Sequence, residues 1–201
     1  MSGPAQLWIT PTSPYARLPR IVLREKGLGG GVTEHVARTR EPGSPFYAVN
    51  PSGRVPCLIL PDGLLMEESA LICDWLDEFD GHPRFTRPTG DDRWSFAMAE
   101  ARARSFLDGL SVWVRELKRP ENERSPGVIA HEAARAVRML ALWEADADSR
   151  WLTGDLNHVQ MALVAALDTL GRLDVPPATG PLLAAWHGRI STRPSIADTT
   201  P

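Results

Sequence analysis

The pattern of apolar and polar positions changes its period along the chain. In the first eighty residues, short runs of three to six mostly apolar residues are bounded by Pro, Gly, Asn and Asp, which is typical of strands. These runs predict strands at 6–10, 33–37, 55–60 and 64–66. Apolar residues at helical spacing predict a helix from residue 14, a short helix at 46–49 and a third helix from residue 69. The first part therefore has an α/β pattern with a small mixed sheet.

The first helix has clear signals at both ends. Ser13 is a natural N-cap, Pro14 suits the first helical position, and Gly27 is a natural residue to follow the last turn. Pro19 falls inside the helix, where it removes one hydrogen-bond donor. We therefore expect either a kink or a late start of the regular helix.

The stretch from Asn50 to Trp75 predicts a hairpin followed by a helix. Pro61, Asp62 and Gly63 supply the turn between the two short strands. Ser69 is the expected N-cap of the helix that follows.

Pro56 is out of place at the start of a strand, because proline cannot donate a hydrogen bond to a neighbouring strand. One interpretation is an edge strand or a first strand position. The other is a cis peptide at Val55–Pro56, in a bend that leaves the backbone of Val55 available to a peptide-like ligand.

The second part of the chain is helical. Residues 81–90 are rich in Pro and Gly and predict a linker between a domain at 1–80 and a domain at 91–201. Helices are predicted at 92–118, 126–147, 157–173 and 181–191. Asn157 and Gln160 have the spacing of a capping box at the start of the third of these helices.

Composition excludes several classes of protein. A net charge of −3 argues against nucleic-acid binding as the main task. The chain has no apolar run long enough for a membrane span and no basic-then-apolar start typical of a secretory signal, so we expect a cytoplasmic location. Cys57 and Cys73 are expected to be buried and reduced, and the scattered histidines indicate no metal site.

Three motifs in this order resemble the cytosolic glutathione transferases over nearly the whole chain. They are Ser13-Pro14-Tyr15-Ala16-Arg17, Asn50-Pro51-Ser52-Gly53-Arg54-Val55-Pro56 and Glu68-Ser69-Ala70-Leu71-Ile72. The resemblance implies a thioredoxin-like N-terminal domain followed by an all-helical C-terminal domain. It also implies a cis Val55–Pro56 peptide, a homodimer, and glutathione as co-substrate with no metal.

The resemblance places the binding of the γ-glutamyl end of glutathione on Glu68 and Ser69. The chemistry of these residues agrees, because a helix start attracts a carboxylate and Glu68 suits an ammonium group. The backbone of Val55 would pair with the cysteinyl residue, beside Pro56. Arg54, or less directly Arg38 or Arg40, would pair with the glycyl carboxylate.

Ser13 is the expected catalytic residue, with its hydroxyl donating to the glutathione thiolate. The alternative is that Ser13 only caps its helix, since serine is a leading N-cap residue. Thr10 and Thr12 are further candidate donors, and Tyr15 is less favoured because it lies one turn into the helix.

The expected activity is attack of the thiolate on a small hydrophobic electrophile, typical of detoxification. Because serine cannot form a mixed disulfide with glutathione, conjugation or isomerisation is favoured over thiol–disulfide exchange. The alternatives are a glutathione-dependent isomerase and a non-catalytic binding protein with the same fold. Trp94, Met98 and Arg102 share one helix face, which either lines the electrophile pocket or packs against the sheet or a partner subunit.

Overall fold

The computed structural model describes residues 3–201 and divides them into two compact units. The first unit contains the chain up to Thr86 together with Ser195–Pro201, and the second contains Arg87–Pro194. The elements of the first unit are β1 (Ala5–Ile9), α1 (Pro14–Glu25), η1 (Leu28–Gly30), β2 (Val32–Val36), α2 (Phe46–Val49), β3 (Cys57–Ile59), β4 (Leu65–Glu67) and α3 (Ser69–Glu78). Those of the second unit are α4 (Asp92–Leu117), η2 (Glu121–Glu123), α5 (Pro126–Ala145), α6 (Arg150–Thr153), α7 (His158–Leu170) and α8 (Pro181–Ser191). The short helix α9 (Pro194–Ala197) begins where the chain returns to the first unit.

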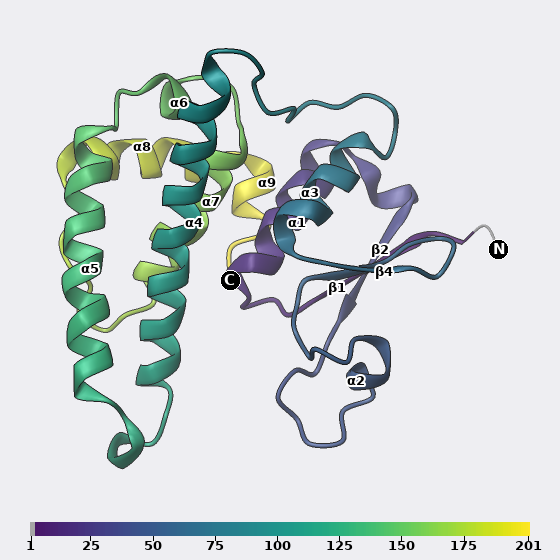
Figure 1. Cartoon of the computed structure of the whole chain (residues 1–201), viewed down its shortest axis with the longest axis horizontal. Helices are drawn as coiled ribbons and strands as arrows, with labels where there is room; N and C mark the ends of the chain where they lie inside the picture. Colours follow the sequence, from purple (N-terminus) through teal and green to yellow (C-terminus); the bar gives the residue numbers. More distant parts are fainter. Residues whose placement is uncertain (1–2) are drawn as a thin grey trace. The chain divides into compact units, whose positions relative to one another are not determined.

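The first unit is built on a mixed four-stranded sheet in the order β2-β1-β3-β4. β1 pairs with β2 in parallel, whereas β3 pairs with β1 and β4 in antiparallel fashion. Helices α1 and α3 lie on one face of the sheet and α2 lies on the other (Figure 1). This thioredoxin-like sheet followed by a helical region confirms the predicted fold class.

Alternation along β1 explains how both faces of the sheet are filled. Ala5, Leu7 and Ile9 are fully or almost fully buried, while the intervening Trp8 is partly exposed. Trp8 pairs with Cys57 and packs on the α2 side against Phe46 of that helix. Side chains at successive strand positions point to opposite faces, so β1 supplies the core on both sides.

Helix α1 begins at Pro14 and runs through Pro19 without interruption. Of the two predicted alternatives, a kink and a late start, the late start is wrong, because the buried face of the helix outweighs the single hydrogen bond that proline removes. The predicted ends are confirmed: Ser13 is the N-cap, and Gly27 follows the helix with a φ of 65°, a conformation that glycine adopts at low cost.

The second unit packs around α7, in which 12 residues are buried, among them Ala162, Leu163 and Leu167. Helix α7 packs mainly against the long helix α4, and α4 also packs against α5. Asn157 caps α7 by accepting from the amides of Val159 and Gln160. The reciprocal half of the predicted capping box is wrong, because the side chain of Gln160 donates instead to the carbonyls of Trp151, Gly154 and Asp155.

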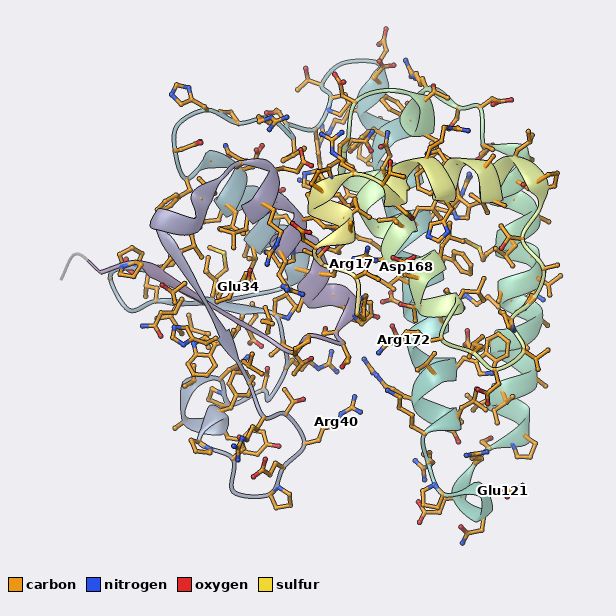
Figure 2. All side chains as sticks on the ribbon, turned by 180° about the vertical axis from the view of Figure 1, so that it is seen from behind. Arg17, Glu34, Arg40, Glu121, Asp168 and Arg172 are labelled. Carbon is orange, nitrogen blue, oxygen red and sulfur yellow. The ribbon has the colours of Figure 1, made fainter. Side chains whose placement is uncertain are left out.

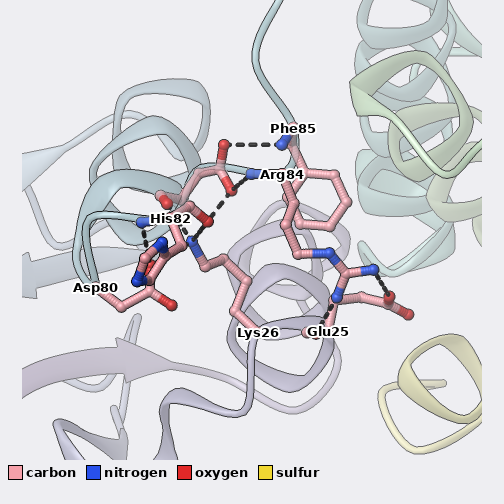
Figure 3. Close-up of polar contacts among 7 residues, drawn as sticks. Glu25, Lys26, Asp80, His82, Arg84 and Phe85 are labelled. Carbon is pink, nitrogen blue, oxygen red and sulfur yellow. Dashed lines mark hydrogen bonds and ion pairs between the residues drawn. The ribbon is translucent and has the colours of Figure 1, made fainter.

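A cluster of polar contacts around Lys26 holds the chain where it leaves α3 (Figure 3). The Asp77 carboxylate accepts from the backbone amides of Arg84 and Phe85, each at 2.8 Å. The ammonium group of Lys26 donates to Asp80 and to the carbonyl of His82, each at 2.7 Å. These bonds fix the start of the predicted linker on the ends of α1 and α3.

Within residues 3–201, no helix is long and apolar enough to cross a membrane. Over the same residues, no three His, Cys, Asp or Glu side chains lie together in a way that could hold a metal ion. Cys57 and Cys73 are both buried, as predicted, and over the same residues neither forms a disulfide.

Candidate functional site

The strand register brings the three sequence motifs to one end of the sheet. Trp8 lies opposite Cys57, and Cys57 lies opposite Glu67. The end of β1, the start of β3 and the end of β4 therefore lie side by side. The loop to Ser13, the peptide before Cys57 and the start of α3 all leave the sheet there.

Ser13 lies at the junction of the β1 loop and α1. Its backbone amide donates to the carbonyl of Thr10 at 3.0 Å, and its side-chain oxygen accepts from the amide of Ala16 at 3.2 Å. Accepting this bond uses one lone pair and leaves the hydroxyl proton able to donate. Capping and donation to a ligand are therefore compatible roles for the same side chain.

The Val55–Pro56 peptide is cis, which confirms the second interpretation of this proline, a cis peptide in a bend, over an edge strand. Strand β3 begins only at Cys57, so the prediction that the strand starts at Val55 is wrong by two residues. Among the described residues, neither the amide nor the carbonyl of Val55 has a hydrogen-bond partner. The backbone of Val55 can therefore pair with an extended peptide.

Glu68 is the N-cap of α3, and Ser69 is its first helical residue, so the prediction that Ser69 is the N-cap is wrong. Glu68 has a φ of 72°, which is uncommon for a residue other than glycine, and its side chain is exposed. This conformation turns the chain sharply from β4 into α3. Ser69 is buried, and its hydroxyl donates to the Glu68 carboxylate at 3.3 Å.

The start of α3 offers backbone donors beside this carboxylate. The first hydrogen bond of the helix runs from the Ile72 amide to the Glu68 carbonyl. The amides of Ala70 and Leu71 have no acceptor among the described residues. Such a helix start suits a carboxylate, while the carboxylate of Glu68 suits a cation.

The loop before Val55 is held by Asn50, a residue that sequence reasoning did not assign to the site. Asn50 is completely buried, and its side chain bonds the Arg54 carbonyl at 3.0 Å, the Ser52 amide at 3.0 Å and the Glu67 carboxylate at 2.9 Å. The signal in the sequence is an Asn-Pro-Ser-Gly turn, in which the Asn side chain bonds the backbone two residues on. Nothing in the sequence indicated that Glu67 closes this network across the hairpin.

Gly53 shows how closely this loop is packed. It has a φ of 66°, and a Cβ atom at this position would lie 2.8 Å from the ring of Tyr47. The loop therefore requires glycine both for its backbone angle and for the close approach of an aromatic ring.

The three candidate arginines for the glycyl carboxylate are all exposed. Arg54 directly precedes Val55, Arg38 lies 3.8 Å from the carboxylate of Glu41, and Arg40 has a φ of 63°. Figure 2 labels Arg40 on its loop. Arg54 is the one that shares the Asn50 network, because its carbonyl accepts from Asn50.

Cys57 is not a candidate nucleophile, although it lies next to this loop. Burial raises the pKa of the Cys57 thiol to about 11, so the thiolate is scarce at neutral pH. The chemistry of any thiol reaction at this site must therefore come from a bound ligand rather than from the protein's own cysteine.

Comparison with known proteins shows that the chain is similar to glutathione S-transferases. Residues 12–78 match the family model of the glutathione S-transferase N-terminal domain. Glutathione S-transferase 2 of Saccharomyces cerevisiae is 28% identical over 94% of this chain and 87% of its own length. An uncharacterised glutathione S-transferase-like protein of Escherichia coli is 25% identical over 94% of this chain and 95% of its own length.

Solved structures extend the similarity to both units. A glutathione transferase family member from Pseudomonas fluorescens Pf-5, with bound glutathione, is 28% identical with a TM-score of 0.84 over 98% of each chain. A glutathione S-transferase from Methylobacillus flagellatus KT, also with glutathione bound, is 28% identical with a TM-score of 0.85 over 98% of this chain and 99% of that one.

Proposed function

We propose that the chain, whose residues 12–78 match the family model of the glutathione S-transferase N-terminal domain, binds glutathione and activates the glutathione thiol for attack on a small electrophile. The observation that carries this proposal is the register of the sheet, which brings the Ser13 loop, Val55 and the start of α3 to one end. The bound glutathione in two similar solved structures supports the choice of ligand.

Each group of glutathione has a matching partner in this proposal. The amides at the start of α3 bind the γ-glutamyl carboxylate, and Glu68 binds the neighbouring ammonium group. The Ser69 hydroxyl, which donates to Glu68 at 3.3 Å in the structure, turns to the γ-glutamyl carboxylate when glutathione binds. The backbone of Val55, held beside Pro56, pairs with the cysteinyl residue. Arg54 is the proposed partner of the glycyl carboxylate.

Ser13 is the proposed catalytic residue. An unperturbed thiol has a pKa of about 8.5, and lowering it by about two units requires about 2.7 kcal/mol of thiolate stabilisation. A hydrogen bond to a charged group contributes about 1.5–3 kcal/mol, and the positive end of α1 adds up to about 1 kcal/mol. One hydroxyl at this helix start can therefore supply the stabilisation that lowers the thiol pKa by about two units.

When the electrophile is an activated aryl halide, the thiolate first adds to the ring carbon that bears the halogen, and the halide leaves in a second step. The thiol proton is released to solvent, the sulfur forms a bond to the ring carbon, and the halide leaves with its bonding electrons. Ser13 holds the thiolate before attack and supplies no proton to the leaving halide.

Turnover of a generic aryl halide tests this role in wild type, Ser13→Ala and Ser125→Ala. Ser125 is a matched control, because it also caps a helix that begins with proline and its side chain accepts from the amide of Val128. We expect Ser13→Ala to lose at least about tenfold in kcat/KM, since one charge-assisted hydrogen bond is removed. Ser125→Ala should keep wild-type activity, and equal activity of all three proteins would contradict the role of Ser13.

The binding-only alternative makes a different prediction. A non-catalytic protein would be retained on immobilised glutathione but would not turn over the aryl halide or isomerise an unsaturated acid. Product analysis with both kinds of substrate separates conjugation from glutathione-dependent isomerisation.

We further propose that the protein acts in the cytoplasm, in detoxification, as a homodimer. Large apolar side chains are exposed on single helix faces, with Leu71 on α3 and Trp94 and Met98 on α4. Exposed apolar groups of this kind are suited to an interface with a second copy. Light scattering in solution is expected to give twice the mass of one chain.

A further inference from the structure

The Glu67 side chain joins two parts of the proposed glutathione site. Glu67 is the last residue of β4 and directly precedes Glu68. Its carboxylate accepts from the Asn50 amide at 2.9 Å and from the Ser52 hydroxyl. It thereby connects the strand that leads into α3 with the loop that leads into Val55.

The loop is held from within by a second set of bonds. The Asn50 side chain also bonds the Arg54 carbonyl, and the Ser52 hydroxyl accepts from the Arg54 amide at 3.2 Å. Both side chains that Glu67 binds are therefore bonded to the backbone of Arg54. Any shift of Glu67 relative to the loop changes the position of Val55, the next residue.

We propose that Glu67 is a positioning residue that sets the distance between Val55 and the start of α3, and so the affinity for glutathione. This inference rests on the proposed function. Glu67 does not itself contact glutathione; it acts through Asn50 and Ser52.

The chemistry of the contact explains why a carboxylate serves here. The hydrogen bonds from Ser52 and from Asn50 lower the pKa of the Glu67 carboxyl, and the charge of Arg54 adds to this effect. An ionised carboxylate accepts from both donors at once, and such bonds are stronger than those between neutral groups. Alanine at this position would leave the buried Asn50 amide with one acceptor fewer.

A rigid tripeptide site needs both ends at a fixed separation. Glutathione would bind α3 with its γ-glutamyl end and Val55 with its cysteinyl residue, so a change in their separation weakens both contacts together. Stabilisation of the thiolate depends on Ser13, which lies on a different loop. Loss of Glu67 should therefore weaken binding of glutathione without changing turnover once the site is filled.

The experiment compares wild type, Glu67→Ala, Glu67→Gln, Ser52→Ala and Glu34→Ala. Glu34 is a matched control, because it also lies on an edge strand and its carboxylate accepts from two side chains, Arg20 at 2.8 Å and Arg24 at 2.6 Å. Calorimetry measures the Kd for glutathione, and steady-state kinetics measure KM and kcat. Circular dichroism and thermal unfolding show whether each variant folds.

For Glu67→Ala we expect the Kd and KM for glutathione to rise about tenfold, with kcat at saturating glutathione within about twofold of wild type. Glu67→Gln keeps an acceptor oxygen and should recover most of the affinity. Ser52→Ala should show a smaller rise in Kd than Glu67→Ala, and it provides the test if Glu67→Ala does not fold. Glu34→Ala should lose stability and keep the wild-type Kd.

Two results would overturn this inference. One is a wild-type Kd in Glu67→Ala or, if that variant does not fold, in Ser52→Ala. The other is an equal loss of affinity in Glu34→Ala, since that would reflect general destabilisation. If wild type itself binds no glutathione, the proposed function fails instead, which is a separate result.

Discussion

At the scale of single residues, the same side chain can serve structure and chemistry. Ser13 caps α1 by accepting a hydrogen bond, and its proton remains available to a ligand. Ser125 makes the same type of cap on α5 in the second unit. Because the two serines share their local structure, a difference between their alanine variants reports on the surroundings of Ser13 and not on helix capping.

Glu100 of α4 leads to a prediction on the dependence of stability on pH. Burial raises the pKa of its carboxyl, but the bond from Arg87 and the charge of Arg104 outweigh this and hold the pKa at about 2. Its distances to the two guanidinium groups are 2.7 Å and 3.0 Å. The stabilisation is therefore fully present above the unfolded pKa of about 4.5 and is lost as the pH falls towards 2.

We expect wild type to lose about 3 kcal/mol of this stabilisation between neutral pH and pH 2. Glu100→Gln cannot titrate at this position, so its unfolding free energy should fall less over the same range. Urea unfolding at several pH values measures this, with Glu121→Gln, at an exposed position, as the control. Parallel pH curves for wild type and Glu100→Gln would contradict the assignment.

At the scale of helices and strands, the sequence predicts those features that neighbouring residues determine, namely the ends of helices and the positions of tight turns. Ser13, Pro14 and Gly27 set the ends of α1, and the turn at Pro61–Gly63 set the hairpin, because each acts through its own backbone geometry. The local sequence around Pro56 is compatible with an edge strand or a cis peptide, and the structure has the cis peptide.

Contacts between distant residues could not be predicted in the same way. The bond between Asn50 and Glu67 depends on the hairpin register, and the N-cap role of Glu68 depends on how sharply β4 turns into α3. For Gln160, spacing predicted a partner inside the cap, but the folded chain surrounds its amide with carbonyls of the preceding turn. These partners exist only after the tertiary structure has formed.

Gln160→Glu tests that local environment. Gln160 is buried, and its amide nitrogen lies 3.0–3.1 Å from three carbonyl oxygens. A carboxylate there would face acceptors and find no donor, so we expect a loss of about 3 kcal/mol at neutral pH.

The loss should decrease as the pH falls, because a protonated carboxyl can donate to a carbonyl. Burial among acceptors raises the folded-state pKa of the new carboxyl. The loss of unfolding free energy is therefore largest at a pH above this pKa, where the carboxyl would be ionised. Chemical unfolding measures the difference, with the exposed Gln6→Glu as control. An effect no larger than that of Gln6→Glu would show that the bonds of Gln160 do not matter for stability.

At the scale of the whole molecule, the chain ends in the unit where it begins. Residues 195–201 return to the first unit, and there Arg17 of α1 donates to the Thr199 hydroxyl at 3.3 Å and to the Ile196 carbonyl at 3.0 Å. Figure 2 labels Arg17 on its helix. The linear pattern predicted a helical second part but not this return, because the segment after residue 191 is short and carries no long apolar period.

Thr199→Val tests the contribution of this segment. Thr199 is fully buried, and valine keeps its shape but leaves a donor of Arg17 without this acceptor. We expect a loss of about 1–3 kcal/mol in unfolding free energy and faster hydrogen exchange in α1. Thr192→Val removes an exposed hydroxyl that donates to the Arg189 carbonyl and should change stability by less than about 0.5 kcal/mol. Equal effects of the two variants would contradict a role for the returning segment.

The pKa of the thiol of bound glutathione tests whether Ser13 stabilises the thiolate. Ultraviolet absorbance of the thiolate, followed against pH, gives this value for wild type, Ser13→Ala and Ser125→Ala. We predict a pKa about two units below the free value of about 8.5 in wild type and Ser125→Ala, and a value near that of the free thiol in Ser13→Ala. A bound thiol that keeps the same lowered pKa in Ser13→Ala would contradict the catalytic role of Ser13.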